Sequence, residues 1–216
     1  LTFNGVSEIT LLGQNVNAYR GVMSNGEIAD FSILLEYVAE IDEIKRIRFT
    51  TSHPNEMTDN LINCFKSIDK LAKAIHLPMQ SGSDRVLSAM KRNYTSIEYK
   101  SIIRKLRKVC PDISLTSDFI IGFPNETDLE FMSTLNVMKE LEFDYSYSFL
   151  YSPRPGTPAS YIEDNIPNTI KQQRLEVFQN LNATQGRKYT ESMKGTVQRV
   201  LFDHYSVKKK DTLLGK

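Results

Sequence analysis

Apolar residues follow two different periods along this chain. Short stretches in which every second residue is apolar predict β-strands, and longer stretches with apolar residues at helical spacing predict α-helices. The predicted strands are residues 7–12, 45–50, 74–79, 113–121 and 143–151. The last has the clearest alternation, because every second residue in it is aromatic: Phe143, Tyr145, Tyr147, Phe149 and Tyr151.

Helices are predicted between these strands. Thr95 and Thr127 are each followed three residues later by Glu, which is the spacing of a capping box at a helix start. A long helix is predicted over residues 167–193, and residues 196–202 predict one further strand.

Strands that alternate with helices at intervals of roughly 30 to 40 residues are typical of βαβ units and a parallel sheet. Every predicted strand ends in a polar cluster that favours a loop. In a barrel such loops meet at one mouth, whereas in an open doubly wound sheet only the loops at the switch point do. The pattern therefore favours a partial barrel, and because it gives no strand order the doubly wound sheet stays open.

Bulk composition is that of a soluble globular protein. The 216 residues are 40% hydrophobic and 25% charged, enough for one large domain or one and a half ordinary ones. No apolar run of about 18 residues predicts a transmembrane helix. The first residues resemble no signal peptide and lack an initiator Met, so we expect a piece of a longer chain.

Cys64 and Cys110 occur in no CxxC pattern, so the sequence contains no cysteine-rich metal motif. Two reduced cysteines of a cytoplasmic protein are the simplest interpretation. His53 and His76 have no acidic partner at a recognisable ligand spacing, so they indicate structure or substrate contact rather than a metal site.

The net charge of +1 hides an asymmetry. Residues 171–216 hold ten Lys or Arg against four Asp or Glu, whereas residues 1–170 are acidic overall. A basic end behind an acidic body indicates either a nucleic-acid partner or a solvated basic helix, and charge alone leaves both open.

Five motifs at the predicted strand ends resemble the radical S-adenosylmethionine (SAM) methylthiotransferases, most closely their tRNA-modifying branch. They are EITLLGQNVNAY (8–19), RIRFTTSHP (46–54), HLPMQSGSD (76–84), SDFIIGFPNE (117–126) and SYSFLYSPRPGTP (146–158). The family usually has Gly where this chain has Asn125. Asn tolerates left-handed backbone, so we expect that loop to keep its shape.

The resemblance implies a partial, TIM-like (β/α) barrel of the radical SAM type over residues 1–192, without its first strand, followed by the start of a small β-domain of the TRAM type, which binds RNA, over residues 193–216. In the family a CxxxCxxC loop holds the 4Fe–4S cluster that cleaves SAM, and this sequence has no such motif. We therefore expect no metal ligands and no catalytic residues in this piece, and no activity from it alone. Without that first strand, the predicted strand 7–12 would lose its expected neighbour, and we expect the unpaired edge to make the isolated piece poorly soluble or partly molten.

The implied reaction of the whole protein adds a methylthio group to C2 of N6-isopentenyladenosine next to the anticodon of a tRNA. SAM is the implied cofactor, together with 4Fe–4S clusters in the whole protein. The implied partner is tRNA, with no membrane, a cytoplasmic location and a monomeric full-length form. The alternatives are methylthiolation of threonylcarbamoyladenosine or of a ribosomal-protein aspartate, a non-catalytic RNA-binding fragment, and a metal-independent lyase barrel.

The motif match also implies site residues. Those for SAM are Gln14, Gln80, Ser81, Asp118, Gly122 and Pro124. Those for the substrate are Ser52, His53 and Arg154, and those for RNA are Arg187, Lys188, Lys194 and Arg199. Each has a structural alternative, such as a helix cap, a loop hydrogen bond or an exposed surface position.

Overall fold

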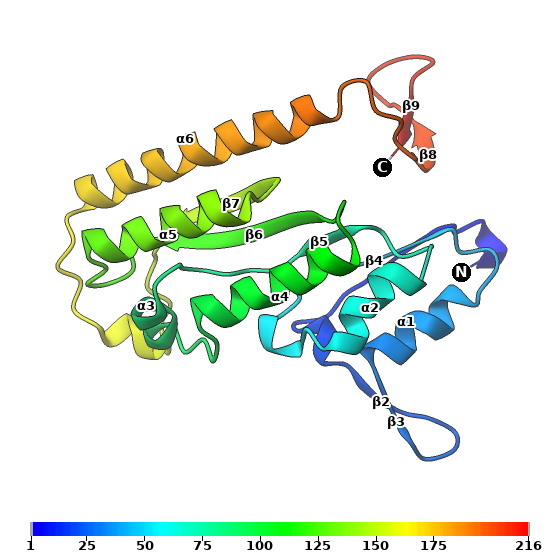
Figure 1. Cartoon of the computed structure of the whole chain (residues 1–216), viewed down its shortest axis with the longest axis horizontal. Helices are drawn as coiled ribbons and strands as arrows, with labels where there is room; N and C mark the ends of the chain where they lie inside the picture. The colour runs from blue at the N-terminus through cyan, green and yellow to red at the C-terminus, as the bar shows by residue number, and fades with distance from the viewer. Residues whose placement is uncertain (1, 216) are drawn as a thin grey trace. The chain divides into compact units, whose positions relative to one another are not determined.

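Five parallel strands form the centre of the computed structural model, which describes residues 2–215 (Figure 1). They are β1 (Glu8–Leu11), β4 (Arg46–Phe49), β5 (Ala74–His76), β6 (Ser114–Ile121) and β7 (Tyr145–Leu150). β1 pairs with β4, and β5, β6 and β7 pair in that order. Residues 70–72, which hydrogen-bond to Ile47 of β4, lead directly into β5. The five predicted strands and their parallel pairing are confirmed.

The order of the strands in space follows their order along the chain. A doubly wound sheet reverses direction at a switch point, and this sheet does not. Right-handed crossovers that always step the same way place all the connecting helices on one face. The predicted partial barrel is therefore confirmed over the open doubly wound alternative.

Helices follow the strands as predicted. They are α1 (Phe31–Ala39), α2 (Asp59–Ser67), α3 (Asp84–Ala89), α4 (Ser96–Val109), α5 (Asp128–Leu141) and α6 (Asn168–Ser192). Both predicted capping boxes are present: the side chains of Thr95 and Thr127 accept from the backbone N–H of Glu98 and Glu130, whose carboxylates accept from the caps in return. Two otherwise unpaired N–H groups are thereby satisfied at each helix start.

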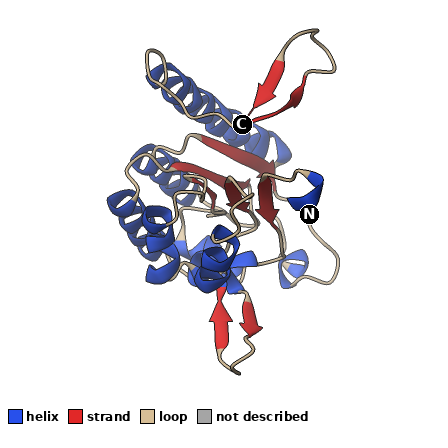
Figure 2. Cartoon of the chain, turned by 90° about the vertical axis from the view of Figure 1, so that its right-hand side faces the viewer, coloured by secondary structure: helices blue, strands red, loops and turns tan. Residues whose placement is uncertain are grey.

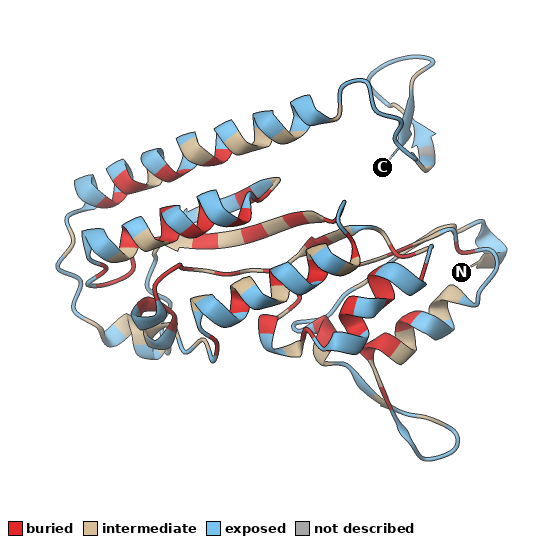
Figure 3. Cartoon of the chain, in the orientation of Figure 1, coloured by how far each residue is buried: buried red, intermediate tan, exposed pale blue. Residues whose placement is uncertain are grey.

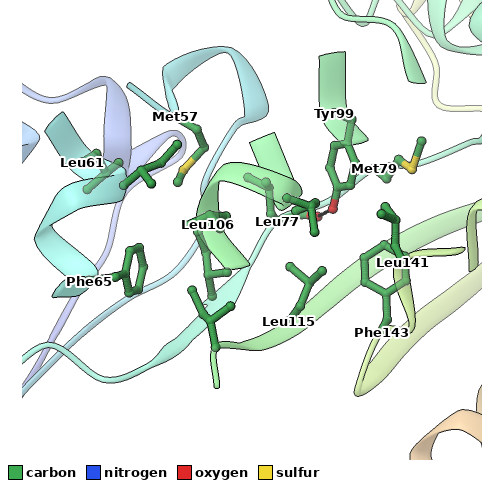
Figure 4. Packing of buried hydrophobic residues seen from close by; sticks show 14 of the residues in the cluster. Met57, Leu61, Phe65, Leu77, Met79, Tyr99, Leu106, Leu115, Leu141 and Phe143 are labelled. Carbon is green, nitrogen blue, oxygen red and sulfur yellow. Dashed lines mark hydrogen bonds between the residues drawn. The ribbon is translucent and has the colours of Figure 1, made fainter. Parts of the chain in front are cut away.

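The core lies between the sheet and these helices. Leu115, Ser117, Phe119 and Ile121 of β6 are buried, while the residues that alternate with them are half-buried (Figure 3). Figure 4 shows Leu115 next to Leu77 and Leu106, with the Tyr99 hydroxyl donating to the carbonyl of Leu77 at 2.7 Å. One face of the sheet therefore packs on helices, and the other stays partly open.

A β-hairpin, β2 (Arg20–Val22) and β3 (Ile28–Asp30), occupies the region where we expected only a loop (Figure 2). Asn25-Gly26 at its tip is a common hairpin signal, and Gly26 adopts φ +84°. That dipeptide could have predicted the hairpin. Within residues 2–215 the chain also forms short 3-10 helices at Thr2–Asn4, Val16–Ala18, Pro54–Glu56 and Pro158–Tyr161.

Residues Leu1–Gly186 form one compact unit and Arg187–Lys216 a second, so the division falls within α6. The second unit contains the antiparallel strands β8 (Phe202–Tyr205) and β9 (Leu213–Gly215). The strand predicted over 196–202 is wrong, because pairing with β9 starts only at Phe202. Thr196 instead closes the turn after α6 through hydrogen bonds to the carbonyl of Met193.

Among the helices described in residues 2–215, we find none with the length and apolar character that a membrane crossing requires.

Candidate functional site

The open face of the sheet carries polar and aromatic side chains. The strand register places His76 of β5 beside Thr116 of β6, and Asp118 beside Tyr147 of β7. Nδ1 of His76 lies 3.0 Å from Oγ1 of Thr116, and Nε2 lies 3.3 Å from a carboxylate oxygen of Asp118. The Tyr147 ring meets the His76 ring edge-on with centroids 6.2 Å apart. Asp118 thus faces the open side of the sheet, where a ligand can reach it.

Sequence reasoning did not predict this cluster. The period of β6 shows that Thr116 and Asp118 share a face, but only the register between strands shows that His76 and Tyr147 join them. Register depends on pairing between distant parts of the chain, so no local pattern contained it.

Arginines extend the same face toward the first strand. Arg46 and Arg48 of β4 are half-buried and alternate with the buried Ile47 and Phe49. Arg46 forms an ion pair with Glu8 of β1 at 3.6 Å. The open face therefore offers cationic, acidic and aromatic groups to a polar ligand.

Two of the predicted residues at the strand ends lie in the loop after β4. Ser52 is buried, and its hydroxyl makes no hydrogen bond with any residue that the structure describes. The backbone of His53 exchanges two hydrogen bonds of 2.9 Å with the side chain of Asn17, and its ring meets Tyr94 edge-on. Burial, with the charge of Arg92 nearby, lowers the pKa of His53 below its ordinary value. A neutral His53 is thereby favoured.

Gln14 is exposed in the loop after β1, and Gln80 follows β5. Gln80 adopts φ +76°, and its backbone N–H donates to the carbonyl of Asp118 at 2.8 Å. This contact holds Gln80 next to the carboxyl end of β6. Ser81, in contrast, is fully buried, with its hydroxyl 3.4 Å from that of Thr134 on α5. The structure therefore brings Gln80 to the open face and turns Ser81 toward the helices.

Gly122 begins the loop that follows β6. It has φ +72°, and a Cβ at this position would lie 2.6 Å from the side chain of Lys171 on α6. Its N–H donates to the carboxylate of Glu126 at 3.0 Å, and Pro124 between them is buried. Asn125 adopts φ +60°, so its backbone has the left-handed conformation that Gly, the usual residue of the family here, adopts without strain.

Glu126 joins this loop to α6. Arg174 donates to the Glu126 carbonyl at 2.9 Å and to its carboxylate at 3.3 Å, and its other terminal nitrogen donates to Asp128 at 2.7 Å. The Arg174 guanidinium also lies over the ring of Phe131, 5.6 Å from its centroid. Burial raises the pKa of the Glu126 carboxyl, and the hydrogen bond from Gly122 and the charge of Arg174 oppose that rise.

The raised pKa of Glu126 predicts a pH-dependent stability. Because the folded state holds the proton more tightly than the unfolded state does, this group stabilises the fold at pH values below its unfolded pKa of 4.5, and the contribution is lost as the pH rises through the folded pKa. Glu126→Gln is uncharged at every pH, so its free energy of unfolding should rise relative to that of the wild type between about pH 4 and pH 7. Urea unfolding of both proteins across this range measures the difference, and a constant difference would contradict the prediction.

The remaining predicted residues are exposed. Arg154 lies in the loop after β7, where its carbonyl accepts from the Thr157 hydroxyl. The predicted RNA-binding residues Arg187, Lys188, Lys194 and Arg199 belong to the second unit, and all four are exposed. Their exposure is compatible with phosphate contacts, and their role stays a prediction.

The cysteines do not fit an iron–sulfur cluster. Cys64 and Cys110 are free and buried, and burial raises the pKa of Cys64 to about 11, whereas a cluster ligand must be a thiolate. Throughout residues 2–215, moreover, no three His, Cys, Asp or Glu side chains gather as a metal site requires.

Comparisons with known proteins identify the family. Residues 1–138 match the family model described as the radical SAM superfamily. The chain belongs to the radical SAM superfamily. The resemblance inferred from the five motifs is confirmed as well, since the chain is 57% identical, over its whole length, to tRNA-2-methylthio-N(6)-dimethylallyladenosine synthase of Methylobacillus flagellatus. It is 58% identical to the Chromobacterium violaceum protein of the same name over 99% of its length. The chain spans 49% and 48% of the length of those two relatives.

Coproporphyrinogen III oxidase from Escherichia coli, a radical SAM enzyme, has a similar structure. The TM-score is 0.58 at 16% sequence identity, over 72% of this chain and 37% of the oxidase. This likeness supports the radical SAM barrel fold and nothing finer.

Proposed function

We propose that this chain is the barrel part of a tRNA methylthiotransferase that adds a methylthio group to C2 of N6-isopentenyladenosine next to the anticodon. The observation that carries the proposal is 57% identity, over the full length of the chain, to a synthase whose name describes that product. The match spans both the strand-end loops and the open face of the sheet, which are the parts of a barrel that bind ligands.

We place SAM at the carboxyl ends of β5 and β6. Gln80 and Asp118 lie side by side there, and Gly122 and Pro124 shape the loop that follows β6. Asp118 can accept hydrogen bonds from a ribose or an ammonium group, and Gln14 and Gln80 can donate and accept. Ser81 would act indirectly, by fixing the buried turn that carries Gln80.

When bound and reductively cleaved, SAM supplies the radical chemistry. This chain's own residues hold and orient it: Asp118 presents a carboxylate that His76 aligns, and the buried loop after β6 limits access of water from that side.

Substrate contacts are proposed for Ser52, His53 and Arg154, since all three follow the carboxyl ends of strands. We propose that residues 193–216 begin an RNA-binding domain of the TRAM type and that Arg187, Lys188, Lys194 and Arg199 neutralise tRNA phosphates. Such binding weakens as salt is added. We also propose that the whole protein is a cytoplasmic monomer.

Mass spectrometry of tRNA nucleosides tests the proposed function. In a strain that lacks the gene for the whole protein, 2-methylthio-N6-isopentenyladenosine should disappear and N6-isopentenyladenosine should accumulate. Loss of the methylthio group from threonylcarbamoyladenosine, or from a ribosomal-protein aspartate, would instead support one of the alternative substrates. An unchanged tRNA nucleoside profile would contradict the proposal.

A further inference from the structure

A pocket of about 330 Å³ lies along β7, and none of the binding residues predicted from the sequence lines it. Its walls are the strand itself and one turn of α6: Tyr145, Ser146, Tyr147, Ser148, Phe149, Gln179, Asn182 and Ala183. This volume is at the lower end of the range for small-molecule pockets, about 300–1,000 Å³. The pocket is thus large enough for one nucleobase and its substituents.

Aromatic rings dominate the strand side of this pocket. Tyr145, Tyr147 and Phe149 alternate along β7 and are 49%, 51% and 54% exposed. They are among the large hydrophobic side chains that the fold leaves exposed, and neighbouring exposed aromatic residues are typical of a binding surface. Planar bases stack on such rings, and each stacked base is stabilised without the need for a particular sequence.

Hydrogen-bonding groups line the edge of the pocket. Asn182 of α6 accepts from the N–H of Ser146 at 3.0 Å and donates to its carbonyl at 2.7 Å, so the backbone of Ser146 points away from β6. Strand alternation turns the N–H and carbonyl of Ser148 the same way, toward the pocket. A donor and an acceptor side by side match the edge of a purine, and Gln179 adds a side-chain amide.

We propose that this pocket binds the substrate base, a purine with an apolar N6 substituent, by stacking on Tyr147 with the substituent against Phe149 and Ala183. The inference rests on the proposed function and adds to it the residues that recognise the base. β7 pairs with β6 beside Asp118, so a base held here lies next to the proposed SAM site. Tyr147 would be a binding residue whose ring positions the base.

Nucleoside binding to the 216-residue chain tests the pocket. Wild-type protein should bind N6-isopentenyladenosine more tightly than adenosine, as measured by ligand-detected NMR or equilibrium dialysis. Tyr147→Ala should weaken binding of N6-isopentenyladenosine about tenfold, in line with the effect of removing one stacking ring. Tyr147→Phe, which keeps the ring, should weaken binding of N6-isopentenyladenosine less than about threefold. Tyr37→Ala is the matched control, because Tyr37 on α1 is 55% exposed and lies outside the pocket.

Ala183→Phe provides a second variant that does not depend on Tyr147. Ala183 is exposed on α6, so a larger side chain should fill the pocket without disturbing the core, and binding should again fall about tenfold. Absence of nucleoside binding by the wild type, or unchanged affinity in both Tyr147→Ala and Ala183→Phe, would overturn the inference. Neither result depends on SAM or on catalysis, so the pocket can fail while the tRNA nucleoside profile still supports the proposed function.

Discussion

Replacing Arg174 with Met is expected to lower the free energy of unfolding by about 3–5 kcal/mol. Arg174 and Glu126 are both buried, and the arginine is the cation that compensates the Glu126 carboxylate. Removal of one partner leaves a buried charge without its counterion, which costs far more than the pair contributes. The loop after β6 should loosen at the same time, because the Glu126 carboxylate also holds the N–H of Gly122. Urea unfolding near neutral pH measures the loss.

Arg104→Met is the matched control for Arg174→Met. Arg104 pairs with Glu140 at 3.3 Å, but its side chain is 70% exposed, so the change should cost no more than about 0.5 kcal/mol. In the double variant Glu126→Gln with Arg174→Met, the uncompensated charge is absent and part of the stability should return. Equal losses in Arg174→Met and Arg104→Met would show that the buried pair has no special role.

Gly82→Ala is expected to lower the free energy of unfolding by about 2–3 kcal/mol. Gly82 lies in the turn after β5, and a Cβ there would sit 2.6 Å from the carbonyl oxygen of Ser133 and from Cα of Thr134. Both atoms belong to the backbone of α5, which cannot move aside as a flexible side chain would. The N–H of Gly82 also donates to the Thr134 hydroxyl at 2.9 Å, so any shift of the helix breaks that bond. Thermal unfolding followed by circular dichroism measures the change.

Gly186→Ala serves as the control and should change the free energy of unfolding in the opposite direction. A Cβ at Gly186 would lie 3.5 Å from the carbonyl oxygen of Asp144, an ordinary contact, and Ala favours helix over Gly by about 1 kcal/mol. The expected result is therefore a small stabilisation. If Gly82→Ala were as stable as the wild type, α5 would have to lie further from this turn than the structure places it.

Local pattern was sufficient for the elements of the barrel. Period-2 alternation located β6 and β7, and the Thr-x-x-Glu spacing located the starts of α4 and α5, because these signals depend only on neighbouring residues. The same pattern was misleading after Gly195, because the segment that starts at Thr196 alternates like a strand but pairs with no strand that the structure describes before Phe202. The five strand-end motifs indicated the family for the same local reason.

The site required tertiary structure. The sequence by itself determined that Gln80 and Gly122 stand at strand ends, that Asp118 lies in the strand before Gly122, and that Tyr145, Tyr147 and Phe149 share one face of a strand. Only the fold decided that His76 reaches Asp118, that Ser81 points into the helices, and that residues of α6 and β7 line one pocket. The physical reason is that register and helix packing are set by contacts between residues far apart in the chain, and a local period carries no record of them.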